Sequence, residues 1–157
     1  MHQFFVEKSQ VGKEYVTITG SDVNHIRNVL RMKIGETVRV SDREGGNYFC
    51  KIAETGENFV QADIVSVDEE GTELPSKIYL FQALPKGDRM ETVIEKAVEL
   101  GVYEIIPVAM KYCVVKLDGK KAAQRVQKWQ AQAETAAKQS KRSIIPKIHE
   151  VVSFQEA

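Results

Sequence analysis

The segment from Tyr79 to Val108 constrains this chain most, because it carries the signals of a strand, a helix and a second strand in succession. Residues Tyr79–Leu84 are apolar apart from Gln82, and this pattern predicts a strand buried on both faces. Residues Ile105–Val108 form a second apolar run and predict a second strand. The segment is therefore typical of an α/β protein.

The helix between these strands has a clear start and a clear end. Asp88 and Glu91 have the spacing of a capping box, in which each side chain bonds the backbone N–H of the other residue. Gly101 stands where a left-handed residue commonly ends a helix. The apolar residues between them fall on one helical face: Met90, Val93, Ile94, Ala97 and Val98.

A strand–helix–strand unit of this kind predicts parallel strands joined by a right-handed crossover. Ligands of such sheets bind at the carboxyl ends of the strands, and the segment Leu84–Asp88 lies at that rim. Lys86 and Arg89 are therefore charged residues placed where a ligand is expected. The loop holds one glycine, Gly87, so a dinucleotide or P-loop site is not indicated.

The first part of the chain predicts short strands separated by polar, glycine-containing turns. Apolar and polar residues alternate within them, which is typical of half-buried strands and favours a small barrel. The expected strands are Phe4–Val6, Tyr15–Thr19, Thr37–Ser41, Tyr48–Ile52 and Phe59–Val67.

One helix is expected within this β-rich part, beginning at Ser21, with Val23, Ile26 and Leu30 on its inner face. Arg27 and Arg31 are four residues apart, so both guanidinium groups are expected on one helix face. Two adjacent guanidinium groups suit phosphate well. The alternative is that both are ordinary surface arginines.

Charge is distributed unevenly although the net charge is zero. Residues 1–72 carry a net charge of −4 and residues 73–157 carry +4, and the segment 111–147 holds 10 Lys and Arg against 2 Asp and Glu. Such an excess indicates a polyanion partner, although a solvated basic helix would look the same. A long helix is expected from Lys120 to Ser140, with Trp129 in its core face and Arg142 just beyond it, where a cation also suits the helix dipole.

The acidic segment Asp68–Ser76 contains Gly71 and Pro75 and predicts a linker. It divides the chain into expected domains at residues 1–70 and 76–157. The two cysteines, Cys50 and Cys113, lie far apart and predict reduced thiols in a cytoplasmic protein. The sequence shows no signal peptide, no membrane-spanning run and no metal-ligand spacing, and it identifies no catalytic residue.

Three motif blocks go further than these patterns. The first is His25-Ile26-Arg27-Asn28-Val29-Leu30-Arg31 followed by Gly35, and the second begins Ala83-Leu84-Pro85-Lys86-Gly87-Asp88-Arg89-Met90. The third contains Trp129-Gln130, Glu134, Ala136-Ala137, Gln139-Ser140, Arg142 and Pro146. In this order they resemble the RsmE-type 16S rRNA uridine-N3 methyltransferases along nearly the whole chain.

The resemblance implies a small PUA-like RNA-binding β-barrel at residues 1–70, followed by a SPOUT-type parallel α/β domain. It implies a homodimer that uses S-adenosylmethionine to methylate one uridine of 16S rRNA in the small ribosomal subunit. The candidate RNA-binding residues are Arg27, Arg31, Lys86, Arg89 and Arg142.

The family's C-terminal knot, with its Gly-Pro-Glu-Gly-Gly cofactor loop, has no counterpart in this sequence. The sequence ends soon after Ser153 and Glu156, which have the spacing of a capping box with no helix behind it. The expectation is therefore a chain like the front two thirds of the enzyme, with no cofactor-binding residues of its own. Two other hypotheses stay open, namely a non-catalytic RNA- or ribosome-binding module and a small-molecule-binding α/β domain.

Overall fold

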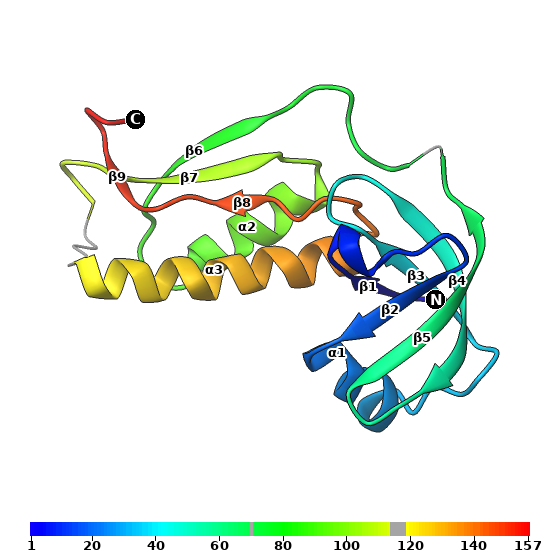
Figure 1. Cartoon of the computed structure of the whole chain (residues 1–157). Coiled ribbons are helices and arrows are strands. Elements are labelled where there is room, and N and C mark those ends of the chain that lie inside the picture. Colours follow the sequence, from blue (N-terminus) through cyan, green and yellow to red (C-terminus); the bar gives the residue numbers. More distant parts are fainter. Residues whose placement is uncertain (70, 114–118) are drawn as a thin grey trace. The chain divides into compact units, whose positions relative to one another are not determined.

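The computed structural model describes residues 1–69, 71–113 and 119–157 and divides into two compact units, Met1–Glu73 and Leu74–Ala157 (Figure 1). The division falls inside the segment Asp68–Ser76, where the sequence predicts a linker. Each unit has its own sheet, so each is described by itself.

Unit 1 is a five-stranded sheet with the order β1-β3-β4-β5-β2. Strands β1 and β3 are parallel, and the other neighbours are antiparallel. The strands are β1 (His2–Phe5), β2 (Tyr15–Thr19), β3 (Thr37–Ser41), β4 (Asn47–Thr55) and β5 (Phe59–Val67). All five expected strands are present, but among the described residues β1 and β2 are not paired, so the predicted barrel is an open half-barrel.

The concave face of the half-barrel holds the core of unit 1. Val16 pairs with Ala62 and Ile18 pairs with Val60, so these four side chains lie on one face, and all are fully buried. Irregular register in β4, at Phe49–Cys50 and at Ile52–Glu54, bends the strand as β-bulges do. The bend lets a single sheet curl around its own apolar side chains.

A short helical segment closes one end of this core. It consists of α1 (Ser21–Asn24) and η2 (His25–Val29), and a turn of 3₁₀ helix, η1 (Lys8–Gln10), precedes it in the chain. Val23 and Ile26 are buried against the sheet, as predicted. The exposed residues of the segment are therefore the ones that face solvent and any ligand.

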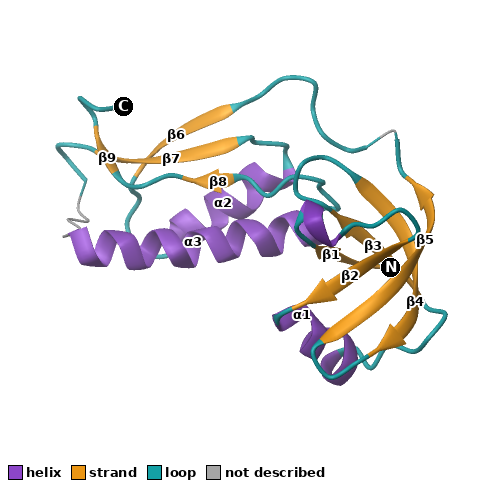
Figure 2. Cartoon of the chain, in the orientation of Figure 1, coloured by secondary structure: helices purple, strands orange, loops and turns teal. Residues whose placement is uncertain are grey.

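Unit 2 is a parallel α/β sheet with both of its helices on one side (Figure 2). The predicted parallel pairing of β6 with β7 is confirmed, with Tyr79 opposite Glu104. The elements are β6 (Tyr79–Ala83), α2 (Arg89–Glu99), β7 (Glu104–Ala109), α3 (Gly119–Gln139), β8 (Lys147–Ile148) and β9 (Val152–Ser153).

Strand β6 is not buried on both faces, so that prediction is wrong. β6 is an edge strand, and the side chains of Tyr79 and Phe81 are 49% and 54% exposed. The alternate residues Leu80 and Gln82 are half-buried. In the described part of unit 2, the helices cover only one face of the sheet. The other face of β6 is therefore exposed, although its residues are apolar.

The start of α2 also differs from its prediction. Asp88 precedes the helix but makes no side-chain cap bond, so the capping box of Asp88 and Glu91 does not form. Glu91 instead forms an ion pair with Lys128 of α3, with an N–O distance of 2.6 Å. Gly101 has the expected left-handed conformation, with φ of 97°.

Helix α3 matches its predicted bounds, and its small residues pack inward. Trp129 is buried together with Ala133, Ala136 and Ala137. At the end of β9, Ser153 and Glu156 form the predicted capping box, because each side chain accepts a bond from the backbone N–H of the other residue. The Ser153 backbone N–H holds the pKa of the Glu156 carboxyl below its usual value.

Candidate RNA-binding site

The helical segment α1–η2 changes its winding where the arginines lie. The backbone N–H of Leu30 donates to the His25 carbonyl oxygen at 2.8 Å, a bond that spans five residues and marks a π-helical turn. The N–H of Met32 then donates to the Ile26 carbonyl at 3.0 Å. Such wide turns within α-helices are frequent at functional sites.

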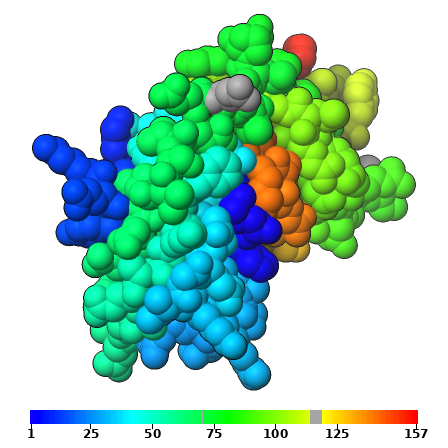
Figure 3. All heavy atoms as spheres, turned by 90° about the vertical axis from the view of Figure 1, so that its right-hand side faces the viewer, coloured from blue at the N-terminus to red at the C-terminus, as the bar shows by residue number. Residues whose placement is uncertain are grey.

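Arg31 therefore lies beyond the helix, in a left-handed conformation with φ of 52°. The prediction that Arg27 and Arg31 share one α-helical face is wrong, because a π-helical turn does not keep the four-residue spacing. Both side chains are exposed. Figure 3 shows one face of unit 1 as spheres coloured from blue to green. The two cations are thus presented by different backbone segments.

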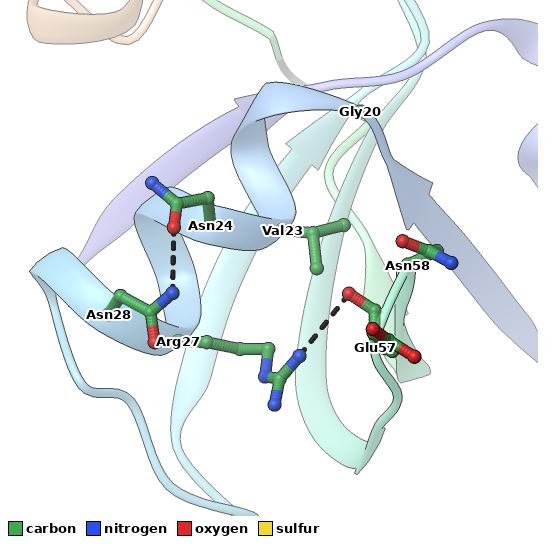
Figure 4. A pocket seen from close by; sticks show the side chains of 7 residues that line it. All are labelled: Gly20, Val23, Asn24, Arg27, Asn28, Glu57 and Asn58. Carbon is green, nitrogen blue, oxygen red and sulfur yellow. Dashed lines mark hydrogen bonds between the residues drawn. The ribbon is translucent and has the colours of Figure 1, made fainter.

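Arg27 reaches across to the turn between β4 and β5. Its Nη1 atom donates to the carbonyl oxygen of Glu57 at 3.2 Å (Figure 4). A guanidinium group has five N–H donors, so this bond leaves most of its donors for a ligand. The contact fixes the direction of a side chain that would otherwise be mobile.

A pocket of about 430 Å³ lies between this helical segment and the turn. Figure 4 shows Asn28 bonded to Asn24 on the helix side, and the Nδ2–Oδ1 distance is 2.7 Å. The pocket is lined by Gly20, Val23, Asn24, Arg27, Asn28, Glu57 and Asn58. Apart from Val23 and Gly20, these side chains are polar or charged and exposed, so the pocket suits a polar ligand.

The asparagines and the β4–β5 turn are not found by the sequence patterns used to predict the site. Residues 55–58 are recognised only as a turn, about thirty residues after Arg27. The tertiary fold brings them together, since antiparallel β5 pairs with β2, the strand that leads into α1. The missed residues include three asparagines, at positions 24, 28 and 58, and all three are exposed. Asparagines that pack against nothing would have been a signal for them.

Lys86 and Arg89 lie at the predicted rim of the sheet in unit 2. Lys86 follows the end of β6, and Arg89 is the first residue of α2. Both side chains are exposed, and neither has an ion-pair partner among the described residues. Gly87 between them has φ of 70°, a conformation that favours glycine.

The basic stretch 111–147 is partly neutralised by local partners, and its residues 114–118 lie outside those that the structure describes. Lys128 pairs with Glu91, and this hydrogen bond raises the pKa of the lysine. Lys138 lies 3.3 Å from the carboxylate of Glu134. The charge of this stretch therefore has structural uses besides any polyanion.

Arg142 does not present its charge to solvent. It is 4% exposed, and its Nη1 atom donates to the carbonyl oxygens of Val102 at 2.5 Å and Val98 at 3.3 Å. The guanidinium group thereby ties the end of α3 to the end of α2. An RNA contact does not fit this position, because the guanidinium group is buried and bonded to backbone carbonyls.

Other kinds of site find little support in the described part of the chain. No three His, Cys, Asp or Glu residues there gather into a possible metal site. Cys50 and Cys113 are both free thiols, as predicted. None of the described helices is long and apolar enough to span a membrane.

Two family models match the chain in succession. An RNA methyltransferase PUA domain matches residues 18–65, and an RNA methyltransferase domain matches residues 72–157. The first covers most of unit 1, including the Arg27 pocket, and the second covers unit 2 with its rim.

Individual relatives agree with these models. The ribosomal RNA small subunit methyltransferase E of Bacillus subtilis is 36% identical over 99% of this chain, which covers 62% of that protein. The Mycobacterium tuberculosis protein of the same name is 27% identical over 96% of this chain and 57% of its own length. This chain thus spans about three fifths of the length of these relatives.

A solved structure shows the same fold. The crystal structure of the ribosomal RNA small subunit methyltransferase E from Neisseria gonorrhoeae, bound to S-adenosyl methionine, matches with a TM-score of 0.86 and 31% identity. The match covers 99% of this chain and 64% of that one. With a PUA half-barrel followed by an RNA methyltransferase domain of the SPOUT class, this chain belongs to the RsmE family of ribosomal RNA small subunit methyltransferases.

Proposed function

We propose that this chain serves the S-adenosylmethionine-dependent methylation of N3 of one uridine in 16S rRNA. The observation that carries the proposal is the succession of the PUA and methyltransferase models along nearly the whole chain. The 36% identical Bacillus subtilis relative is a ribosomal RNA small subunit methyltransferase, which supports the substrate class. Ribosomal RNA implies action in the cytoplasm, and we propose a homodimer as the working form.

Methylation at N3 determines what the RNA-binding residues must do. N3 lies on the Watson–Crick edge of uracil, so the target base must be unpaired or splayed out before it can react. S-adenosylmethionine would supply an electrophilic methyl group, and N3 must lose its proton as it attacks. Holding the RNA in one position contributes much of the rate, because reacting atoms must be aligned.

Arg27 and Arg31 are the proposed contacts of the half-barrel with the RNA backbone, because both are exposed cations, Arg27 at the pocket and Arg31 just after η2. Lys86 and Arg89 are the proposed contacts of unit 2, since they lie at the strand ends where ligands of parallel sheets bind. Guanidinium groups bind phosphate with two parallel hydrogen bonds, which fixes position as well as charge. These four residues would thus position the RNA, and no catalytic role is assigned to any of them.

The described rim does not fit the cofactor by itself. S-adenosylmethionine has a positively charged sulfonium, whereas the exposed side chains at this rim are the cations Lys86 and Arg89 with one carboxylate, Asp88. No residue of this chain is therefore assigned to the cofactor. We expect calorimetry to show no micromolar binding of S-adenosylmethionine to the 157-residue chain, and such binding would contradict this assignment.

A chimera tests the proposed function. Residues 1–157 would replace the matching part of the Bacillus subtilis relative, and nucleoside analysis of small-subunit rRNA would measure 3-methyluridine. The account predicts that the chimera forms 3-methyluridine with unmodified rRNA and S-adenosylmethionine. A folded chimera that binds rRNA without forming 3-methyluridine would contradict the proposed reaction.

The alternative function is RNA or ribosome binding without catalysis. The charges of the rim favour this alternative for the 157-residue chain on its own, because the exposed residues of the rim do not match the cofactor. The chain alone would then bind rRNA and transfer no methyl group. The same nucleoside analysis, performed on the chain alone and on the chimera, separates this function from the catalytic one.

A further inference from the structure

Besides the cation of Arg27, the pocket offers hydrogen-bonding amide groups. The bond from Asn28 Nδ2 to Asn24 Oδ1 uses one donor and one acceptor and holds the two amides against each other. It leaves the amide N–H groups of Asn24 and the carbonyl oxygen of Asn28 for other partners. The helix side of the pocket therefore presents donors and an acceptor in fixed positions.

The opposite side of the pocket is fixed as well. A side chain at Gly56 would meet the Phe59 ring at 2.2 Å, so the ring packs directly on the glycine that precedes Glu57 and Asn58. The Gly56 backbone N–H also donates to the Phe59 carbonyl oxygen at 2.8 Å. The turn carrying Glu57 and Asn58 is thus held by its own strand, and Arg27 ties it to η2.

The pocket combines hydrogen-bond donors, acceptors and a carboxylate, and this combination favours a nucleotide over a bare phosphate ion. Phosphate accepts hydrogen bonds only, and the Glu57 carboxylate at the pocket would repel a dianion. A nucleobase edge presents donors beside acceptors, which is what asparagine side chains match. RNA is read in this way where its bases are unpaired.

The size of the pocket is consistent with such a ligand. Its volume of about 430 Å³ lies within the range of roughly 300–1,000 Å³ for small-ligand sites. Figure 4 shows Arg27 crossing from the helix toward Glu57, with Asn24 and Asn28 together on the helix side and Asn58 on the side of the turn. A nucleotide on the helix side of the pocket would therefore meet the guanidinium and the pair of Asn24 and Asn28.

We propose that this pocket holds one unpaired nucleotide of the RNA, with its phosphodiester on Arg27 and its base edge on Asn24 and Asn28. The inference rests on the proposed function, because it assigns part of the RNA to a defined place. It adds base recognition to a half-barrel whose arginines alone would bind any phosphate backbone.

The test compares RNA with and without bases. Short homopolymers of each of the four ribonucleotides, and an abasic ribose-phosphate oligomer of equal length and charge, would be titrated against the 157-residue chain. At least one homopolymer is expected to bind about tenfold more tightly than the abasic oligomer, the size of one good base-edge contact. In Asn24→Ala and Asn28→Ala this preference is expected to vanish.

Arg27→Gln is expected to weaken both kinds of oligomer equally, because it removes the phosphate contact and keeps the asparagines. Arg43→Gln is the matched control, since Arg43 lies in the turn at the other end of β4. The substituted side chains are exposed, so circular dichroism is expected to show wild-type folding.

Three results would overturn the inference. A wild-type chain without preference for bases would reduce the pocket to a phosphate contact. A preference that survives both asparagine substitutions would place the base elsewhere, and the proposed function would stand in either case. A wild-type chain that binds no oligomer and no rRNA would overturn both the inference and the proposed RNA function of the half-barrel.

Discussion

Arg39 and Asp68 form an ion pair at 2.8 Å that joins β3 to the residue just after β5. The side chains are 9% and 20% exposed, so the pair is largely removed from water. Arg39 also lies over the Phe49 ring, with 5.8 Å between the guanidinium carbon and the ring centroid. The beginning of the predicted linker is therefore anchored to the half-barrel.

Removing the carboxylate of this pair should destabilise unit 1. In Asp68→Ala the buried Arg39 charge loses its partner, and we expect the free energy of unfolding to fall by about 2–4 kcal/mol. Urea denaturation measures the loss. Glu44→Ala is the control, because Glu44 lies 2.7 Å from Lys8 in an exposed pair and should change stability by less than about 1 kcal/mol. Equal effects of both variants would argue against a structural role for the Arg39–Asp68 pair.

Limited proteolysis should cut first between Asp68 and Ser76. Exposed polar segments between compact units open at low cost, and the division of the chain falls here. The ion pair of Asp68 should direct cleavage to the later part of the segment. Mass spectrometry of the first two fragments locates the cut, and early cleavage within Tyr79–Val108 would contradict the proposed domain boundary.

Arg142→Ala should destabilise unit 2 without a direct effect on RNA. The substitution leaves the Val102 carbonyl without its guanidinium donor and removes the link between the ends of α2 and α3. We expect a loss of about 2–3 kcal/mol in urea denaturation. Arg125→Ala on the exposed face of α3 serves as the control and should stay near wild type. Unchanged stability with weaker RNA binding in Arg142→Ala would restore Arg142 as a candidate RNA contact.

Cys50 should resist thiol reagents in the folded chain. Burial raises the pKa of its thiol to about 11, so only about one thiol in a thousand is ionised at pH 8. A Cys113→Ser variant leaves Cys50 as the one thiol and should react slowly until urea unfolds it. Because the folded pKa is raised, this thiol stabilises the fold below pH 9, and the contribution is lost as the pH rises toward 11. Rapid labelling of the native variant would show that Cys50 is accessible.

Local patterns predicted the regular elements of this chain well. Strands β2, β3 and β5 have the predicted bounds, because their alternating residues match a half-buried sheet. Gly101 and the Ser153–Glu156 box were also predictable, since each depends on neighbouring residues alone. Helix α3 follows its apolar periodicity in the same way.

The differences arise where a distant partner decides the outcome. Glu91 could have capped its own helix but pairs with Lys128, which only tertiary packing brings near. Tyr79 and Phe81 are apolar yet exposed, because the position of β6 at the sheet edge is a property of strand order. Arg142 looked like part of a basic patch, and two backbone carbonyls more than thirty residues away hold it instead.

Only the cationic residues of the site could be predicted from the sequence. Arg27 is exposed at a pocket, but the pocket depends on the β4–β5 turn and on the π-helical turn at η2, and neither has a simple periodic signal. The left-handed conformation of Arg31 likewise follows from how the segment ends. Its proposed role therefore rests on its exposure and its position just after η2.

The central claim is that the half-barrel recognises RNA through Arg27 and Arg31, and salt-dependent binding tests it most directly. The double variant Arg27→Ala, Arg31→Asn keeps a residue that tolerates the left-handed conformation at position 31. Arg43→Asn is the matched control, because Arg43 is also left-handed, with φ of 64°. Circular dichroism would confirm that each variant is folded.

Affinity for small-subunit rRNA would be measured at several salt concentrations. The account predicts weaker binding by the double variant and a log–log salt dependence flatter by about 0.7 for each lost phosphate contact, with the control unchanged. A folded double variant with wild-type affinity and an unchanged slope would contradict the claim and remove this segment from the RNA interface.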